Sequence, residues 1–216
     1  IVSNVDLLSG SFYLNGHEMT VDHNFWVYEN GAFFMDNPAD ILNVASNTSD
    51  WFWFLPGSEV LLSGGIVNLG GWINPHSGCS FTATVDNTIR LIKPATNSGA
   101  GLANFEPSAS YGNIVIDSDG TTKVLDASSS QPFIINGNLT ISAGDALETQ
   151  NKTLMLHGDF IDHPGSELFV YQRNKTGKDT NAYITHPTNI PSEKSSKGGY
   201  FEVDNPLIIN LSLIHI

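Results

Sequence analysis

The stretch Ile135–Leu168, INGNLTISAGDALETQNKTLMLHGDFIDHPGSEL, carries the clearest pattern in the chain. Short apolar runs in it are separated by clusters of Gly, Asn, Asp, Ser and Pro, which mark tight turns. The pattern predicts strands at Ile135–Ile141, Thr153–His157, Phe160–Ile161 and Glu167–Val170, with turns at 142–145, 149–152 and 163–166. Four strands of this length within one stretch indicate an all-β chain.

The same pattern returns elsewhere in the chain at regular distances. Phe25 and Trp72 are 47 residues apart, Trp72 and Phe160 are 88 apart, and Gly137–Leu139 and Gly158–Phe160 are 21 apart. A unit of roughly 21–25 residues divides all three distances, as two, four and one repeats. Repeats of this size favour a solenoid, in which each coil pairs its strands with the coils above and below.

We therefore expect an all-β, right-handed parallel β-helix with coils of roughly 21–25 residues and protruding loops. Residues 1–210 form one such solenoid, interrupted by a loop or insertion at about 172–199, where five of the nine basic residues gather. No window shows helical apolar spacing. A sugar-binding β-sandwich remains an alternative, and strand direction separates the two, because sandwiches are largely antiparallel.

Composition narrows the classes of partner. The formal net charge is −13, a sign that repels nucleic acid and anionic lipid. No apolar run approaches the roughly 20 residues that span a bilayer, so we expect no membrane insertion. Cys79 is the only cysteine, which excludes an intrachain disulfide.

The two ends of the sequence indicate how the chain relates to the full polypeptide. The chain opens at Ile1 in mid-pattern, as an internal fragment does, so we expect the rest of the same polypeptide to adjoin it at both ends. The last six residues, Leu211–Ile216, match in every codon the translated transposon end that is used in sequencing-library preparation. We predict that they are a non-native tail.

The chain resembles the parallel β-helix regions of large bacterial secreted and surface proteins. Their coil pattern, GNLTI-turn-LxxxxxTLxLxGDF-turn-G, is matched by Gly137–Ile141, Leu147, Thr153–Leu156, Gly158–Phe160 and Gly165. The resemblance implies an adhesin-like, modular, extracellular or cell-surface protein of the class exported by the type IX pathway.

Carboxylates are the candidates for catalysis. Equivalent residues of a parallel solenoid stack about 4.8 Å apart, so Asp159 and Asp162 are a possible acidic pair for a glycoside hydrolase. A polysaccharide lyase would need a base beside the acids, for which Arg90 and Lys93 qualify by residue type alone. No catalytic motif accompanies these residues, and we interpret the acids as solvated corner residues.

Metal binding has one weak candidate. Asp117 and Asp119 alternate before Gly120, as in part of a calcium loop. The glutamate that ends such a loop is missing, because Ser128 stands at its position. We predict an ordinary turn there, and no metal or other cofactor.

Aromatic residues are the candidates for binding. Alternation along a strand places neighbouring side chains of Trp51–Phe54 on opposite faces, so one pair must lie outward. Trp26 and Tyr28 raise the same question, and outward rings of Trp26, Tyr28, Trp51 and Trp53 would stack on a polysaccharide or cell-surface glycan, unless a loop covers them. The favoured function is a structural or adhesive segment without catalysis; a carbohydrate-active enzyme or a glycan-binding module is the alternative.

Overall fold

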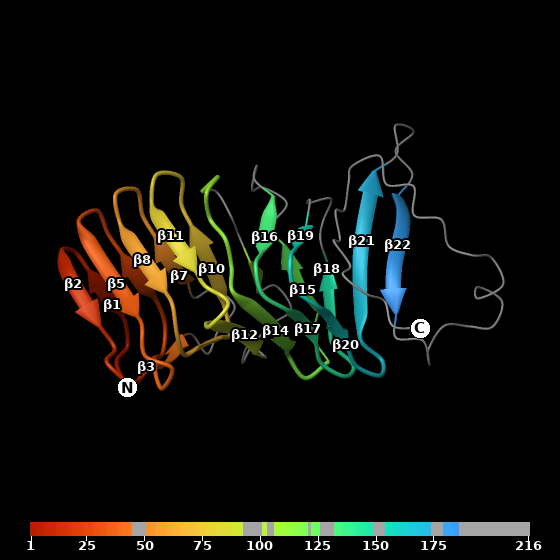
Figure 1. Cartoon of the computed structure of the whole chain (residues 1–216), viewed down its shortest axis with the longest axis horizontal. Helices are drawn as coiled ribbons and strands as arrows, with labels where there is room; N and C mark the ends of the chain where they lie inside the picture. The colour runs from red at the N-terminus through yellow and green to blue at the C-terminus, as the bar shows by residue number, and fades with distance from the viewer. Residues whose placement is uncertain are drawn as a thin grey trace.

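The computed structural model describes residues 1–44, 51–92, 101–102, 106–120, 122–125, 132–148, 154–173 and 179–185, with side chains up to Leu168. Within these ranges the chain is a parallel β-solenoid of about six turns and contains no helix. The strands stack along the long axis from the N-terminus to β21 and β22 (Figure 1). The predicted parallel solenoid is confirmed.

Three faces are formed by three main sheets, which we call sheets A, B and C. Sheet B contains β1 (Val5–Leu7), β4 (Phe25–Val27), β7 (Trp51–Phe54), β10 (Trp72–Pro75), β13 (Gly101–Leu102), β15 (Thr122–Leu125), β18 (Ala146–Glu148), β21 (Glu167–Arg173) and β22 (Asp179–Thr185). Sheet C contains β2 (Gly10–Tyr13), β5 (Gly31–Met35), β8 (Glu59–Leu62) and β11 (Ser80–Ala83). Sheet A contains β3 (Glu18–Val21), β6 (Ile41–Val44), β9 (Ile66–Leu69), β12 (Thr88–Ile92), β14 (Asn113–Asp117), β17 (Leu139–Ile141) and β20 (Phe160–Asp162). A short fourth sheet pairs β16 (Phe133–Ile135) with β19 (Leu154–Leu156).

The coil length varies more widely than the sequence indicates. Paired residues of successive coils are 20 residues apart between Val5 and Phe25 and 29 apart between Trp72 and Gly101. Most other pairs, such as Leu139 with Phe160, lie within the expected range. The parallel pairing tolerates this variation because extra residues enter at the corners between strands and leave the ladders in register.

The spacing of the repeat predicts that Phe25, Trp72 and Phe160 are equivalent positions, and the structure shows that they are not. Phe25 shares its register position with Ile73, through Phe52, and not with Trp72. Phe160 lies on β20 of sheet A, whereas Trp72 lies on β10 of sheet B. Each corner of the coil uses similar turn residues, so a strand–corner unit from one face resembles a unit from another.

Other boundaries also need correction. The predicted strand Ile135–Ile141 is two strands, β16 and β17, with a corner at 136–138. Within the predicted insertion at about 172–199, β22 runs antiparallel to β21, while 174–178 and 186–199 lie outside the described residues. The predicted non-native tail, 211–216, lies outside them too.

The core is a stack of apolar side chains inside the coil. Phe25, Phe33, Phe52 and Phe54 are fully buried, and their rings contact one another with centroids 4.5 to 5.9 Å apart. Toward the C-terminal coils the stack continues through Phe81, Tyr111 and Phe133. Edge-to-face and offset ring pairs of this kind contribute about 0.5–1.5 kcal/mol beyond the area they bury.

Gly112, Gly137 and Gly158 form a glycine column at the corner before sheet A. The backbones approach so closely there that a Cβ on Gly112 would meet the carbonyl oxygens of Thr84 and Asn87. The residue after each glycine connects the coils, since Asn113 accepts a hydrogen bond from the amide of Asn138 at 2.9 Å. This geometry explains the recurring Gly-Asn and Gly-Asp pairs of the sequence.

Candidate functional site

Strand β7 divides its four aromatic residues between the two faces of sheet B. Phe52 and Phe54 are fully buried in the core, whereas Trp51 and Trp53 lie on the outer face and are half-buried. This is the alternation that the sequence predicts for Trp51–Phe54. In Figure 1, β7 and β10 lie behind β8 and β11.

Neighbouring strands extend the aromatic surface. Trp26 on β4 is in register with Trp53, and their ring centroids are 5.5 Å apart. Tyr28 follows β4, and its ring lies 5.8 Å from that of Trp26. The structure therefore brings together the four residues that the sequence predicts as a stacking surface.

Two further rings join this surface that the sequence analysis did not single out. Trp72 on β10 pairs with Trp51 and stacks on it, with centroids 5.8 Å apart and ring planes 22° apart. His76 lies 6.4 Å from Trp53. We call Trp26, Tyr28, Trp51, Trp53, Trp72 and His76 the aromatic face. Trp72 could have been found from its alternation with buried Ile73.

Electrostatics at the edge of the aromatic face affect Tyr28. Partial burial raises the pKa of its hydroxyl, and the nearby carboxylate of Asp6 raises it further. Asp6 is in register with Trp26 and is exposed. The hydroxyl of Tyr28 therefore remains protonated, and is a hydrogen-bond donor, over the physiological pH range.

The two acids proposed as a catalytic pair take different positions around β20. Asp159 precedes the strand and is exposed, and its amide donates to Asn138 Oδ1 at 2.9 Å. Asp162 ends the strand, half-buried, in register with the buried Ile141. The alternation of a strand directs residues three apart to opposite faces, which is a poor arrangement for two carboxylates that must flank one bond.

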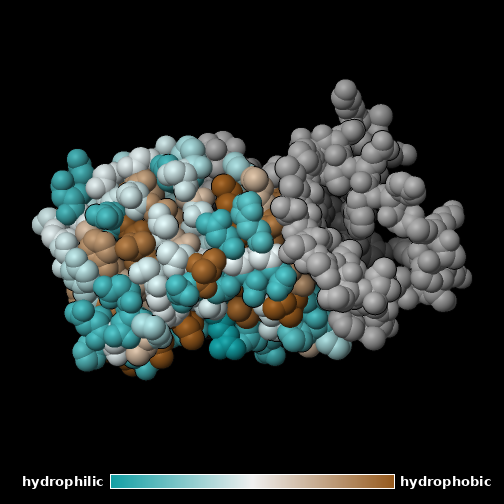
Figure 2. Space-filling view, viewed as in Figure 1, coloured by the Kyte–Doolittle hydropathy of each residue, from teal (hydrophilic) through white to brown (hydrophobic). Residues whose placement is uncertain are grey.

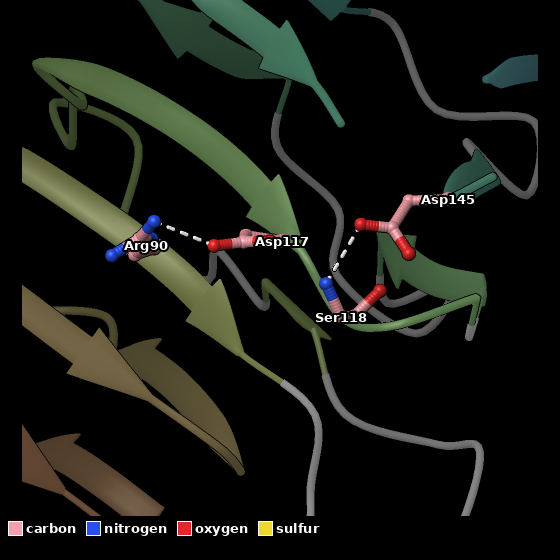
Figure 3. Close-up of polar contacts among 4 residues, drawn as sticks. All are labelled: Arg90, Asp117, Ser118 and Asp145. Atoms are coloured by element: carbon pink, nitrogen blue, oxygen red, sulfur yellow. Dashed lines mark hydrogen bonds and ion pairs between the residues drawn. The ribbon is translucent and has the colours of Figure 1, made fainter. Parts of the chain in front are cut away.

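The candidate calcium residues flank a corner that is already hydrogen-bonded. Asp117 pairs with Arg90 at 2.6 Å, and Asp119 is exposed with a positive φ of 53°. The corner amide of Ser118 donates to the buried Asp145 of the next coil at 2.7 Å, as Figure 3 shows. The guanidinium already neutralises the charge of Asp117, and no group of three or more His, Cys, Asp or Glu side chains suited to a metal ion occurs in the described ranges.

Three buried carboxylates that the sequence analysis overlooked fasten coil to coil. Asp40, Glu106 and Asp145 each accept a hydrogen bond from the amide of a positive-φ glycine in the preceding coil, at 2.5 to 2.7 Å. The glycines are Gly16, Gly78 and Gly120. Burial raises the pKa of Glu106, but hydrogen bonds from Gly78 and Ser108 outweigh it, so the net pKa is lowered. Their role is structural.

Lys123 is a buried basic residue inside the coil. It points inward from β15, is 1% exposed, and donates from Nζ to the carbonyl oxygen of Ile92 at 2.7 Å. Burial lowers its pKa from 10.5 to about 8, although Asp145 opposes the shift. Because Nζ is occupied and enclosed, we assign Lys123 no part in ligand binding.

Comparison of the chain with protein-family models, curated proteins and solved structures gave no match. In the described part of the chain, no helix has the length and hydropathy needed to cross a membrane. The case for a function therefore depends on the aromatic face.

Proposed function

We propose that this chain is a non-catalytic, adhesive segment of a larger extracellular or cell-surface bacterial protein, and that its aromatic face binds a glycan. The observation that carries the proposal is the gathering of Trp26, Trp51, Trp53 and Trp72 on the outer side of one sheet. The location outside the cell is supported by the resemblance to bacterial surface β-helices.

A tryptophan on the outer face of a strand leaves apolar ring surface in contact with water, and binding of a ligand would cover that surface. A solvent-facing strand position normally holds a polar residue, as the outer side of sheet A does with Thr20, Asn43 and Asn68, which are in register. An indole ring has a broad apolar face and a polar edge. Pyranose rings present an apolar C–H face that packs on such a ring while their hydroxyls stay hydrated.

The scaffold holds the rings in fixed positions. Parallel pairing sets the distance between neighbouring strands at about 4.8 Å. The ring centroids of neighbouring tryptophans lie 5.4 to 5.8 Å apart. Rings that are already held in place lose little conformational entropy on binding. A rigid row of this kind suits an extended polysaccharide.

A second apolar surface provides a comparison. Apolar side chains gather over β5 and β8 of sheet C in Figure 2. Tyr13 and Phe34 stack there with centroids 4.6 Å apart, and Tyr13 is 45% exposed. This surface is smaller in aromatic content, and it supplies a matched control for the aromatic face.

The test is a pull-down of the purified chain on insoluble polysaccharides such as cellulose, chitin and mannan. We expect Trp51→Ala and Trp53→Ala to weaken retention about tenfold or more, which corresponds to about 1.4 kcal/mol. The control Tyr13→Ala removes an outward, stacked ring from sheet C and should bind as the parent does. Equal retention of all variants, or none by the parent, would overturn the proposal.

The catalytic alternative is tested on the same preparation. Release of reducing sugar or of unsaturated product that disappears in Asp159→Ala or Asp162→Ala would replace the adhesive function with an enzymatic one. We expect no turnover from the parent chain.

A further inference from the structure

Unpartnered polar atoms concentrate on the aromatic face. Among the described residues, four buried side-chain N or O atoms lack a hydrogen-bond partner: Trp26 Nε1, Trp53 Nε1, Asn74 Oδ1 and Asn87 Oδ1. Asn87 belongs to a corner, where its amide nitrogen donates to the carbonyl oxygens of Gly64 and Gly65. The other three atoms belong to residues that lie side by side in sheet B.

Register places these three residues in one row across the sheet. Trp26 pairs with Trp53, and Trp53 pairs with Asn74. Asn74 also lies two residues after Trp72 on the same strand, so its side chain is on the outer face of the sheet with Trp72, Trp53 and Trp26. Its side chain is only 4% exposed. A buried amide oxygen without a donor is costly, so a strand position that retains one requires an explanation.

The chemistry of the row selects its ligand. Two indole N–H groups are donors and the Asn74 oxygen is an acceptor. A sugar hydroxyl does both, since it accepts from an N–H and donates to a carbonyl oxygen. The net charge of −13 opposes an anionic glycan, and no described basic side chain takes part in the row.

Building on the proposed function, we propose that Asn74, Trp26 and Trp53 supply the hydrogen bonds of a subsite for a neutral, hydroxyl-rich sugar residue. The stacked pair Trp51 and Trp72 supplies the apolar floor beside it. The three polar atoms are covered in the structure, so a side chain that covers them has to move locally to admit the sugar, and we expect binding to change the tryptophan fluorescence.

The test is affinity electrophoresis of the native chain in gels that contain hydroxyethyl cellulose, galactomannan or arabinoxylan, with polygalacturonate as the anionic comparison. We expect retardation by at least one neutral polysaccharide. Asn74→Leu should weaken this binding at least tenfold while the melting temperature stays equal or rises, because the change removes an unsatisfied oxygen. A purely structural asparagine would not separate the two readouts in this way.

The matched control is Asn68→Leu on the outer side of sheet A, where Asn68 donates to Asn43 Oδ1 at 2.8 Å. It should lower the melting temperature and leave binding unchanged. Wild-type affinity in Asn74→Leu together with loss in Trp51→Ala would overturn the subsite and keep the proposed function. Preference for polygalacturonate would overturn the neutral ligand, and absence of binding to every polysaccharide would overturn both proposals.

Discussion

Lys123 is a charged side chain in a buried position. It is enclosed in a coil of apolar residues and in register with the buried Leu147. Burial removes water from the charged ammonium group and so disfavours its protonated form, which lowers its pKa to about 8. The hydrogen bond to Ile92 offsets part of this cost, because hydrogen bonds to charged groups contribute about 1.5–3 kcal/mol.

This lysine makes stability depend on pH in a definite direction. Its pKa is lower in the folded chain than the ordinary 10.5, so between about pH 8 and 10.5 the unfolded chain binds more protons. Stability from this residue therefore rises with pH through that window, by at most about 3 kcal/mol. We expect Lys123→Met to abolish the rise, as measured by urea unfolding at several pH values.

The comparison must be made as a difference between parent and variant. Burial raises the pKa of Cys79 from 9.0 to about 12, so its contribution to stability falls as pH rises above about 9 and opposes that of Lys123. The parent and the Lys123→Met variant both contain Cys79, so its contribution cancels in the difference between their free energies of unfolding. A difference that stays constant from pH 7 to 10.5 would contradict the prediction.

At the scale of the element, the corner decides how coils stack. The glycine column Gly112, Gly137 and Gly158 brings successive backbones together, and the Asn113 side chain then binds the next coil. The sequence signals these corners clearly, because glycine and asparagine recur together. It does not tell which of the faces each corner joins.

We expect Gly112→Ala to destabilise the chain by several kcal/mol, since its new Cβ would meet the backbone oxygens of Thr84 and Asn87, which cannot move independently of their coil. Gly144→Ala is the control: its Cβ meets nothing within 4 Å, but its φ of 77° costs about 1–2 kcal/mol. Thermal unfolding, monitored by circular dichroism, measures the loss of stability in each of the two variants. Equal losses would show that the coil accommodates the new Cβ, and that close approach does not make glycine necessary at position 112.

At the scale of the whole molecule, each coil contacts only its neighbours. Stability is then approximately a sum of coil and interface contributions. Among the described residues, β1 and β2 pair with another strand on one side only, and all four residues of β2 are exposed. Inner coils such as that of β7, β8 and β9 are paired on both sides.

Hydrogen exchange should follow this gradient. We expect the amides of β2 to exchange much faster than those of β8, because opening an end coil breaks one interface and opening an inner coil breaks two. Mass spectrometry of the exchanging chain measures this directly. Uniform protection from β2 to β8 would indicate a single cooperative unit instead of a stack of coils.

The sequence alone predicts a solenoid, with a β-sandwich as the alternative, and it predicts that Trp51 and Trp53 face opposite to Phe52 and Phe54. Both are local consequences, since turn residues mark corners and side chains alternate along a strand. The identity of the residues that become neighbours between coils follows from the fold and not from the local pattern. Corner insertions of different length change the sequence distance between paired residues, so spacing alone does not predict that Trp72 pairs with Trp51 or that Asn74 lies beside Trp53. Contacts between residues some 20 or more positions apart depend on that register, which no local pattern specifies.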